Sequence, residues 1–174
     1  MIVTSEKDLR VQCVDVLPEE VIELVERLDT ELNNSAKNGL PGIGLAGPQI
    51  GINKNIAIIR ISKEISINLV NAKIVSSYDK ALFDGEGCLS FPGRYEKTMR
   101  YQEIHVINDV EPKSFIAKGL FAVAVAHELD HLSGILLPDI ALKKTKKLKV
   151  RPNDPCSCGS LKKYKKCCSK NRVP

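Results

Sequence analysis

The sequence predicts an α+β fold in which short strands lie between two helices along the chain. Three observations lead to this prediction: an amphipathic helical pattern over residues 18–37, strand-like runs between residues 56 and 117, and an apolar helical pattern over residues 120–132. The chain has 174 residues, of which 43% are hydrophobic. This length and composition suit one packed domain and leave little room for a second.

The first helix is predicted from the spacing of its apolar residues. These residues fall on one stripe of the helix, which is formed by Val21, Ile22, Val25, Leu28 and Leu32. Pro18 suits the first turn, and Asn38-Gly39 suits the end of the helix. A glycine-rich loop is expected to follow, from Gly39 to Gly51.

Strands are predicted where β-branched or alternating residues occur between turn residues. The clearest run is Ile56 to Ile61, and weaker runs cover residues 74–77, 103–107 and 115–117. Residues 120–132 are apolar almost all round the helical projection, so this second helix should be buried. Gly134 and Pro138 are expected to close it.

The second helix contains an HExxH sequence, His127-Glu128-Leu129-Asp130-His131. His127 and His131 are four residues apart, so both imidazoles lie on one helical face and can reach one metal ion. Glu128 is well placed to accept a proton from water at that metal. Burying a carboxylate and two imidazoles costs free energy. The apolar setting therefore favours a metal site over two ordinary core histidines.

A hydrolytic metal usually has three protein ligands and one open position. Spacing alone leaves the third ligand open, with Cys13, Cys88, His105 or a carboxylate as candidates. Cys88 follows Gly87, which allows close approach of the backbone, although a lone cysteine is more often a small core residue than a ligand. His105 lies in an alternating run and is interpreted as an ordinary strand residue.

The segment Gly42-Ile43-Gly44-Leu45-Ala46-Gly47-Pro48-Gln49 is the third notable feature. No strand is predicted before it and Pro48 interrupts any following helix, so it is not a dinucleotide-binding loop. Such a loop permits close approach of a ligand to the backbone. Gln49 could donate a hydrogen bond to a developing oxyanion. Taken alone, the segment is more typical of a surface turn.

Together, three segments resemble the three motifs of the peptide deformylase family in order and approximate spacing. These segments are Gly42 to Gln49, Glu86-Gly87-Cys88-Leu89-Ser90, and His127 to His131. The resemblance covers residues 1–142. It implies small, mainly antiparallel sheets packed around the HExxH helix. It also implies metal-dependent hydrolysis of the N-formyl group of formyl-methionine at the start of new polypeptides, with release of formate.

The resemblance also implies the roles of individual residues. The metal ligands would be Cys88, His127 and His131, with Glu128 as the general acid and base. Gln49 and the backbone N–H of Leu89 would stabilise the oxyanion. Ile43, Gly44 and Gly87 would pair with the substrate backbone as an added strand, and Val123 and Ala124 would line the methionine pocket. The implied metal is often ferrous iron, and zinc, nickel or cobalt also suit such sites.

Two other functions stay open at this point. The first is an HExxH endopeptidase, which would need a histidine or carboxylate as third ligand. The second is an inactive deformylase-like binding module. The chain also departs from the family pattern at Gly47, at Ala126 and around Arg94, which shifts by about one place. None of these positions is an implied metal ligand. The departures therefore bear on substrate preference and catalytic rate and not on reaction class.

The C-terminal segment differs from the rest in composition. Cys156, Cys158, Cys167 and Cys168 suit a closed tetrahedral zinc site, and residues 152–168 resemble the SEC-C motif. So short a segment cannot build its own core, so bound metal would supply its folding energy. We therefore expect a catalytic domain over residues 1–142, a basic linker over 143–153 and a zinc-binding element over 154–174.

Charge is distributed unevenly along the chain. Residues 143–174 contain twelve of the 26 basic residues and one of the 21 acidic residues, which gives them a net charge of +11 and the remaining residues −6. A strongly basic tail suggests either an anionic partner, ribosomal RNA or an acidic protein, or a tail that only keeps the protein in solution, and composition does not choose between them. The first residues have no secretory or transit pattern and no run is long enough to span a membrane, so a cytoplasmic location without a membrane partner is expected.

Overall fold

We analysed a computed structural model of the protein, which describes residues 1–143, 151–156 and 158–168. The chain divides into two compact units, Met1–Leu142 and Lys143–Pro174. The first unit contains both helices and all the strands that were predicted, and the α+β prediction is confirmed for it. None of the helices in the described ranges is both long enough and apolar enough to cross a membrane.

In the first unit, two helices precede the strands along the sequence and two follow them. They are α1 (Glu6–Leu9), α2 (Val21–Lys37), α3 (Leu120–Leu132) and α4 (Leu137–Ile140). The predicted bounds of α3 match the structure. The predicted first helix is also present, with Pro18–Glu20 as a 3₁₀ turn before α2. Pro138 does not simply follow α3 but lies in the first turn of α4, where its missing N–H is not needed.

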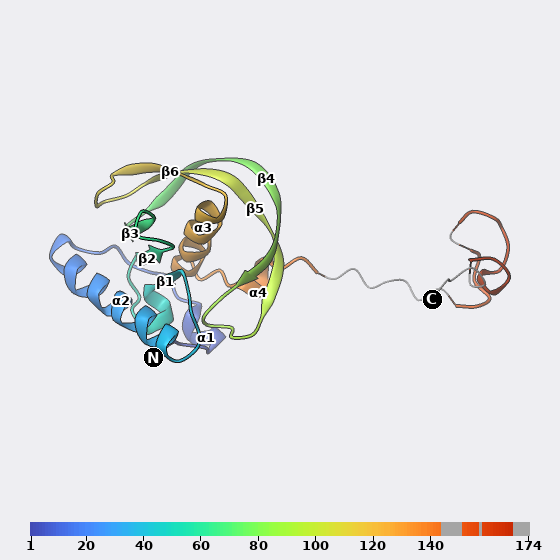
Figure 1. The fold of residues 1–174 in the computed structure, drawn as a ribbon, viewed down its shortest axis with the longest axis horizontal. Coiled ribbons are helices and arrows are strands. Elements are labelled where there is room, and N and C mark those ends of the chain that lie inside the picture. Colours follow the sequence, from blue (N-terminus) through green and yellow to red (C-terminus); the bar gives the residue numbers. More distant parts are fainter. Residues whose placement is uncertain (144–150, 157, 169–174) are drawn as a thin grey trace. The chain divides into compact units, whose positions relative to one another are not determined.

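The strands form two separate antiparallel sheets. One sheet has the order β1-β2-β3 and the other the order β4-β5-β6. Their bounds are β1 (Gly44–Ala46), β2 (Ile56–Arg60), β3 (Ser66–Val70), β4 (Lys73–Gly87), β5 (Tyr95–Ile107) and β6 (Ser114–Lys118). Strands β4 and β5 arch around α3, which lies between the two sheets (Figure 1). This arrangement encloses the HExxH helix.

Four details of the sequence prediction were wrong. The expected loop from Gly39 to Gly51 contains β1 and a 3₁₀ turn, Gly47–Ile50. β3 was not predicted at all, and β4 and β5 extend well beyond the predicted runs. On α2 the buried stripe is rotated slightly about the helix axis from the expected one. Leu24 is buried, whereas Ile22 is 73% exposed.

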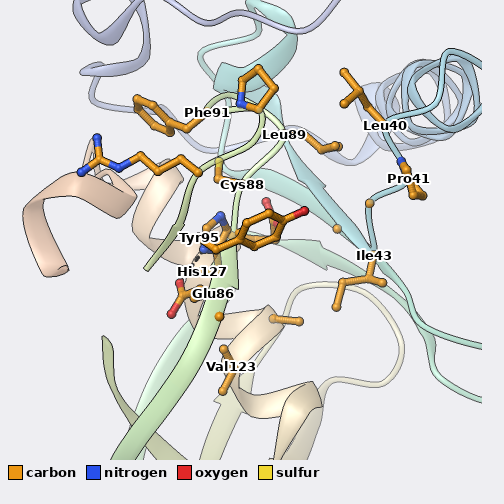
Figure 2. Close-up of a pocket in the computed structure, with 18 of the residues that line it drawn as sticks. Leu40, Pro41, Ile43, Glu86, Cys88, Leu89, Phe91, Tyr95, Val123 and His127 are labelled. Carbon is orange, nitrogen blue, oxygen red and sulfur yellow. Dashed lines mark hydrogen bonds and ion pairs between the residues drawn. The ribbon is translucent and has the colours of Figure 1, made fainter. Parts of the chain in front are cut away.

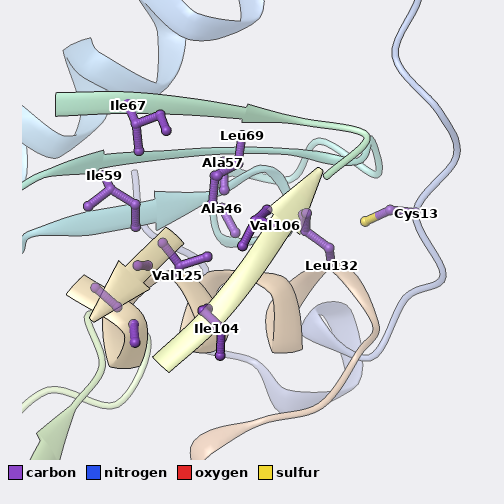
Figure 3. Close-up of a cluster of buried hydrophobic side chains, with 13 residues drawn as sticks. Cys13, Ala46, Ala57, Ile59, Ile67, Leu69, Ile104, Val106, Val125 and Leu132 are labelled. Carbon is purple, nitrogen blue, oxygen red and sulfur yellow. The ribbon is translucent and has the colours of Figure 1, made fainter. Parts of the chain in front are cut away.

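The hydrophobic core has two parts. One cluster lies between the two sheets and α3 and includes Ala57, Ile104 and Val125 (Figure 3). The other lies between α2 and the first sheet and includes Leu28, Leu45 and Ile58. Because α3 contributes apolar side chains to the first cluster, its backbone is held firmly while the polar side of the helix faces a cavity.

Candidate metal centre

Cys88, His127 and His131 come together at the centre of the first unit. Their ligand atoms all lie within 4.8 Å of one another, and Cys88 Sγ is 3.2 Å from His131 Nε2. In a tetrahedral site with ordinary zinc–nitrogen and zinc–sulfur bonds, two such ligand atoms are about 3.5 Å apart. The donor set and its spacing therefore fit a divalent metal ion.

The two histidines differ in charge. Burial would lower the pKa of His127, but its hydrogen bonds with Cys88 and Glu86 outweigh burial and raise that pKa to about 10, so a metal ion must displace a proton from this ring. Burial lowers the pKa of His131 to about 3, so its imidazole is uncharged. His127 Nδ1 lies 2.6 Å from Glu86 Oε1. A carboxylate only accepts, so Nδ1–H donates to Glu86 and Nε2 remains available as a ligand. This carboxylate orients the ring of His127.

Glu86 belongs to a buried ion network that sequence analysis did not identify. Arg100 donates to both Glu86 oxygens, at 2.6 Å and 2.9 Å, and Thr98 donates to one of them at 2.6 Å. Arg100 also donates to Asp130 of the HExxH helix at 2.7 Å. Burial would raise the pKa of Glu86, but the hydrogen bonds from Arg100, His127 and Thr98 outweigh it and lower the pKa to about 2. The network therefore joins β4, β5 and α3 behind the ligands.

The signal that could have revealed this network is weak in the sequence. Thr98 and Arg100 occupy alternate positions of β5 and point inward with Ile104 and Val106. An arginine on the buried face of a strand needs a buried partner. Glu86 directly precedes the Gly87-Cys88 pair, but the pairing of β4 with β5 is needed to bring the two charges together.

Glu128 lies deep in the same cavity. Glu128 is only 4% exposed, and its Oε2 atom has no hydrogen-bond partner among the described residues. Burial raises the pKa of Glu128 to about 7. Gly44 of β1 faces it closely, since a Cβ added to Gly44 would lie 2.4 Å from Glu128 Oε1. A side chain at position 44 would therefore displace the Glu128 carboxylate from this position.

Gln49 is fixed beside the cluster by three contacts. Its Oε1 accepts from the backbone N–H of Ala46 at 2.8 Å. Its Nε2 donates to Ser90 Oγ at 3.2 Å and lies 3.6 Å from Cys88 Sγ. The segment around it is buried, and is therefore not the surface turn that its composition suggested. A side-chain amide is thus held with its N–H groups directed toward the cluster.

A cavity of about 330 Å³ opens onto these residues (Figure 2). All five residues assigned to substrate binding line it, and so do Gln49 and Leu89; the five are Ile43, Gly44, Gly87, Val123 and Ala124. β1 pairs with β2 on one side only. The other edge of β1 borders the cavity, where it could take up an extended peptide.

Two of the alternative ligands lie away from the cluster. His105 is on β5, where its Nε2 contacts Glu103 Oε1 at 3.0 Å. Cys13 is buried in the hydrophobic core, and this burial raises the pKa of its thiol to about 11. Neither residue belongs to the group of ligand atoms around Cys88.

A second group of possible ligands lies in the C-terminal unit. The sulfur atoms of Cys156, Cys158, Cys167 and Cys168 all lie within 4.8 Å of one another. The chain is folded back on itself by backbone hydrogen bonds from Cys156 N–H to Lys162 and from Tyr164 N–H to Asp154, both 2.8 Å. Four thiols converging in so short a segment suit a closed tetrahedral metal site.

Comparisons with known proteins match each part of the chain to a family. The family model described as polypeptide deformylase matches residues 1–147, and that of the SEC-C motif matches residues 153–170.

Two curated relatives and one solved structure show the extent of the similarity. A peptide deformylase of Brucella suis biovar 1 is 35% identical over 158 residues, 76% of this chain and 90% of the relative. One of Heliobacterium modesticaldum is 43% identical over 101 residues, 56% of this chain and 66% of the relative. The crystal structure of a peptide deformylase from Synechococcus elongatus in complex with actinonin superposes with a TM-score of 0.73 at 29% identity, covering 83% of this chain and 80% of that one.

Proposed function

The chain belongs to the peptide deformylase family, and we propose that it removes the formyl group from N-terminal formyl-methionine with a metal held by Cys88, His127 and His131. Members of this family are metal-dependent hydrolases that act on formylated nascent peptides. The observation that carries the proposal is the convergence of the three ligand atoms beside a buried Glu128. Formate release from formyl-Met-Ala-Ser tests it directly.

The residues around the ligands divide the chemistry among them. When bound, the metal acts as a Lewis acid and makes water a stronger nucleophile near neutral pH. Glu128 accepts the proton of the water that attacks the formyl carbon and then donates a proton to the leaving amine. Gln49 Nε2 and the backbone N–H of Leu89 donate to the oxyanion that develops on the formyl oxygen. The bond between the formyl carbon and the amine nitrogen then breaks, and formate leaves.

The substrate backbone is proposed to bind as an additional strand. Ile43 and Gly44 would pair with it on one side and Gly87 on the other, since these residues border the cavity at the ends of β1 and β4. The methionine side chain would then extend toward Val123 and Ala124 of α3, one turn before His127. Support for this pose comes from the free edge of β1 and from the position of the cavity.

Each of the two units is proposed to hold one metal. In the first unit we infer ferrous iron, although one thiolate and two imidazoles also suit zinc, nickel or cobalt. In the C-terminal unit, four thiolates favour zinc. The second ion would be structural, because its four cysteines leave no position for a substrate.

The C-terminal unit is proposed to dock the enzyme on the ribosome, where formylated chains emerge. Four exposed lysines, Lys162, Lys163, Lys165 and Lys166, border Tyr164 in the described part of this unit. Ribosomal RNA is a dense polyanion, and tethering would raise the concentration of enzyme near its substrate. An acidic protein partner is the alternative.

Co-sedimentation with ribosomes tests this docking. The full chain should sediment with ribosomes at low salt and be released steeply as salt rises, because each phosphate contact displaces counterions. A form ending at Leu142 should stay in the supernatant. Replacing the four lysines by glutamine should weaken binding, while replacing them by arginine should preserve it. Equal sedimentation of the full and shortened forms, or binding that ignores salt, would reject the idea.

A further inference from the structure

The segment between Ser90 and Thr98 departs from the common family pattern, and the proposed mechanism assigns it no role. In this segment, Arg94 lines the cavity and donates a hydrogen bond to Glu96 at 2.6 Å. The next residue, Tyr95, begins β5 and lines the cavity.

The ring of Tyr95 lies against Gly87. The two residues are paired in the β4–β5 register, and a Cβ added to Gly87 would lie 3.0 Å from Tyr95 Cε1 and 3.1 Å from Cδ1. The absence of a side chain at Gly87 therefore lets the ring lie over the strand end. In Figure 2 the ring extends into the space bordered by Cys88, Ile43 and Val123.

Tyr95 is unusually exposed for a large aromatic side chain. Its relative exposure is 73%, although it borders a cavity whose other lining residues include Phe83 and Phe91. The chain has four phenylalanines, four tyrosines and no tryptophan, so three of its few aromatic side chains gather at this one cavity. A ring left uncovered at the mouth of a cavity gains free energy when a ligand covers it.

We propose that Tyr95 is a specificity-determining residue whose ring contacts the thioether sulfur of the substrate methionine. The inference rests on the proposed function, which places the methionine side chain in the cavity between Gly87 and Val123. Sulfur–aromatic contacts favour a thioether over a methylene group of the same shape. The contact therefore separates methionine from norleucine, which has the same length but no sulfur.

The test compares formyl-Met-Ala-Ser with formyl-norleucine-Ala-Ser in the metal-loaded full chain. The measured quantity is kcat/KM for the methionine peptide divided by kcat/KM for the norleucine peptide. It is determined for the wild type, Tyr95→Leu and Tyr95→Phe. The ratio should fall by roughly 2- to 12-fold in favour of norleucine in Tyr95→Leu, as expected for loss of one sulfur–aromatic contact. Tyr95→Phe keeps the ring and should keep the ratio. Tyr95→Gln serves as a second variant without an aromatic ring.

Two results would overturn the proposal. An unchanged ratio in Tyr95→Leu and Tyr95→Gln would show that the ring does not contact the sulfur. A ratio that falls equally in Tyr95→Phe would assign the effect to the hydroxyl group instead. If the wild type releases no formate, the proposed function fails. The ratio of dissociation constants for the two peptides, measured with and without Tyr95→Leu in a Glu128→Ala background, still decides the role of Tyr95.

Discussion

Replacing Glu128 by alanine is expected to lower kcat for formate release by about 10²–10⁴-fold, the usual cost of losing a general acid and base. The metal should remain, because Cys88, His127 and His131 are unchanged. Glu128→Gln is the matched variant, since it keeps the size of the side chain that faces Gly44 but cannot accept a proton. Both variants should be equally slow and should bind the same amount of metal as the wild type.

Comparison of Glu128→Gln with Glu128→Ala distinguishes a role of Glu128 in proton transfer from a role in packing. If only the packing of the buried side chain mattered, Glu128→Gln would be nearly as active as the wild type and Glu128→Ala would be less stable. Wild-type turnover in both variants would show that another group moves the proton. Steady-state kinetics together with metal analysis of each variant distinguishes these outcomes.

Replacing Cys88 by alanine should remove the catalytic metal and almost all activity. Two imidazoles alone leave the ion without its thiolate ligand, and the Glu86 carboxylate is already held by Arg100, Thr98 and His127. Metal analysis should fall from two ions per chain to one, the remaining ion being held by the cysteines of the C-terminal unit. Cys13→Ala is the matched control, because Cys13 is also a buried thiol but lies outside the cluster.

The Cys88 result also decides between classes of enzyme. An HExxH endopeptidase with a histidine or carboxylate as third ligand would keep its metal in Cys88→Ala. Two ions per chain in that variant would contradict the proposed centre. If Cys13→Ala lost one ion and Cys88→Ala kept both, the metal ligand would be Cys13 and not Cys88.

Local patterns in the sequence were sufficient to predict α2 and α3, whereas the four-residue helices α1 and α4 were not predicted. The apolar run from Leu120 to Leu132 is long, and only its polar side carries the HExxH residues, so both the helix and its buried position followed from periodicity. β1 could not be predicted in this way, because its three residues lie in a glycine-rich segment and become a strand only by pairing with β2. β3 (Ser66–Val70) is as long as β2, but Ser66 and Asn68 interrupt its apolar run, so it gave a weaker strand pattern.

The site was predictable only in part, for a similar reason. His127 and His131 could be recognised as a pair because their spacing of four residues places them on one face of a helix, and this spacing is a local property of the sequence. Cys88 could be chosen over Cys13 only through the family resemblance, because no local rule connects it to a helix that starts more than thirty residues later. Glu86 and Arg100 are brought together by strand pairing. Long-range contacts of this kind are set by the whole fold and leave little trace in composition.

The measurement that tests the central claim most directly is formate release from formyl-Met-Ala-Ser by the full chain loaded with ferrous iron under exclusion of oxygen. Acetyl-Met-Ala-Ser and an internal peptide bond of the same sequence serve as controls. We predict stoichiometric formate together with free Met-Ala-Ser, and no cleavage of the internal bond. Cleavage of the internal bond would identify an endopeptidase. Binding of the formylated peptide without any formate, in protein that retains both metals, would show a binding module and contradict the proposed function.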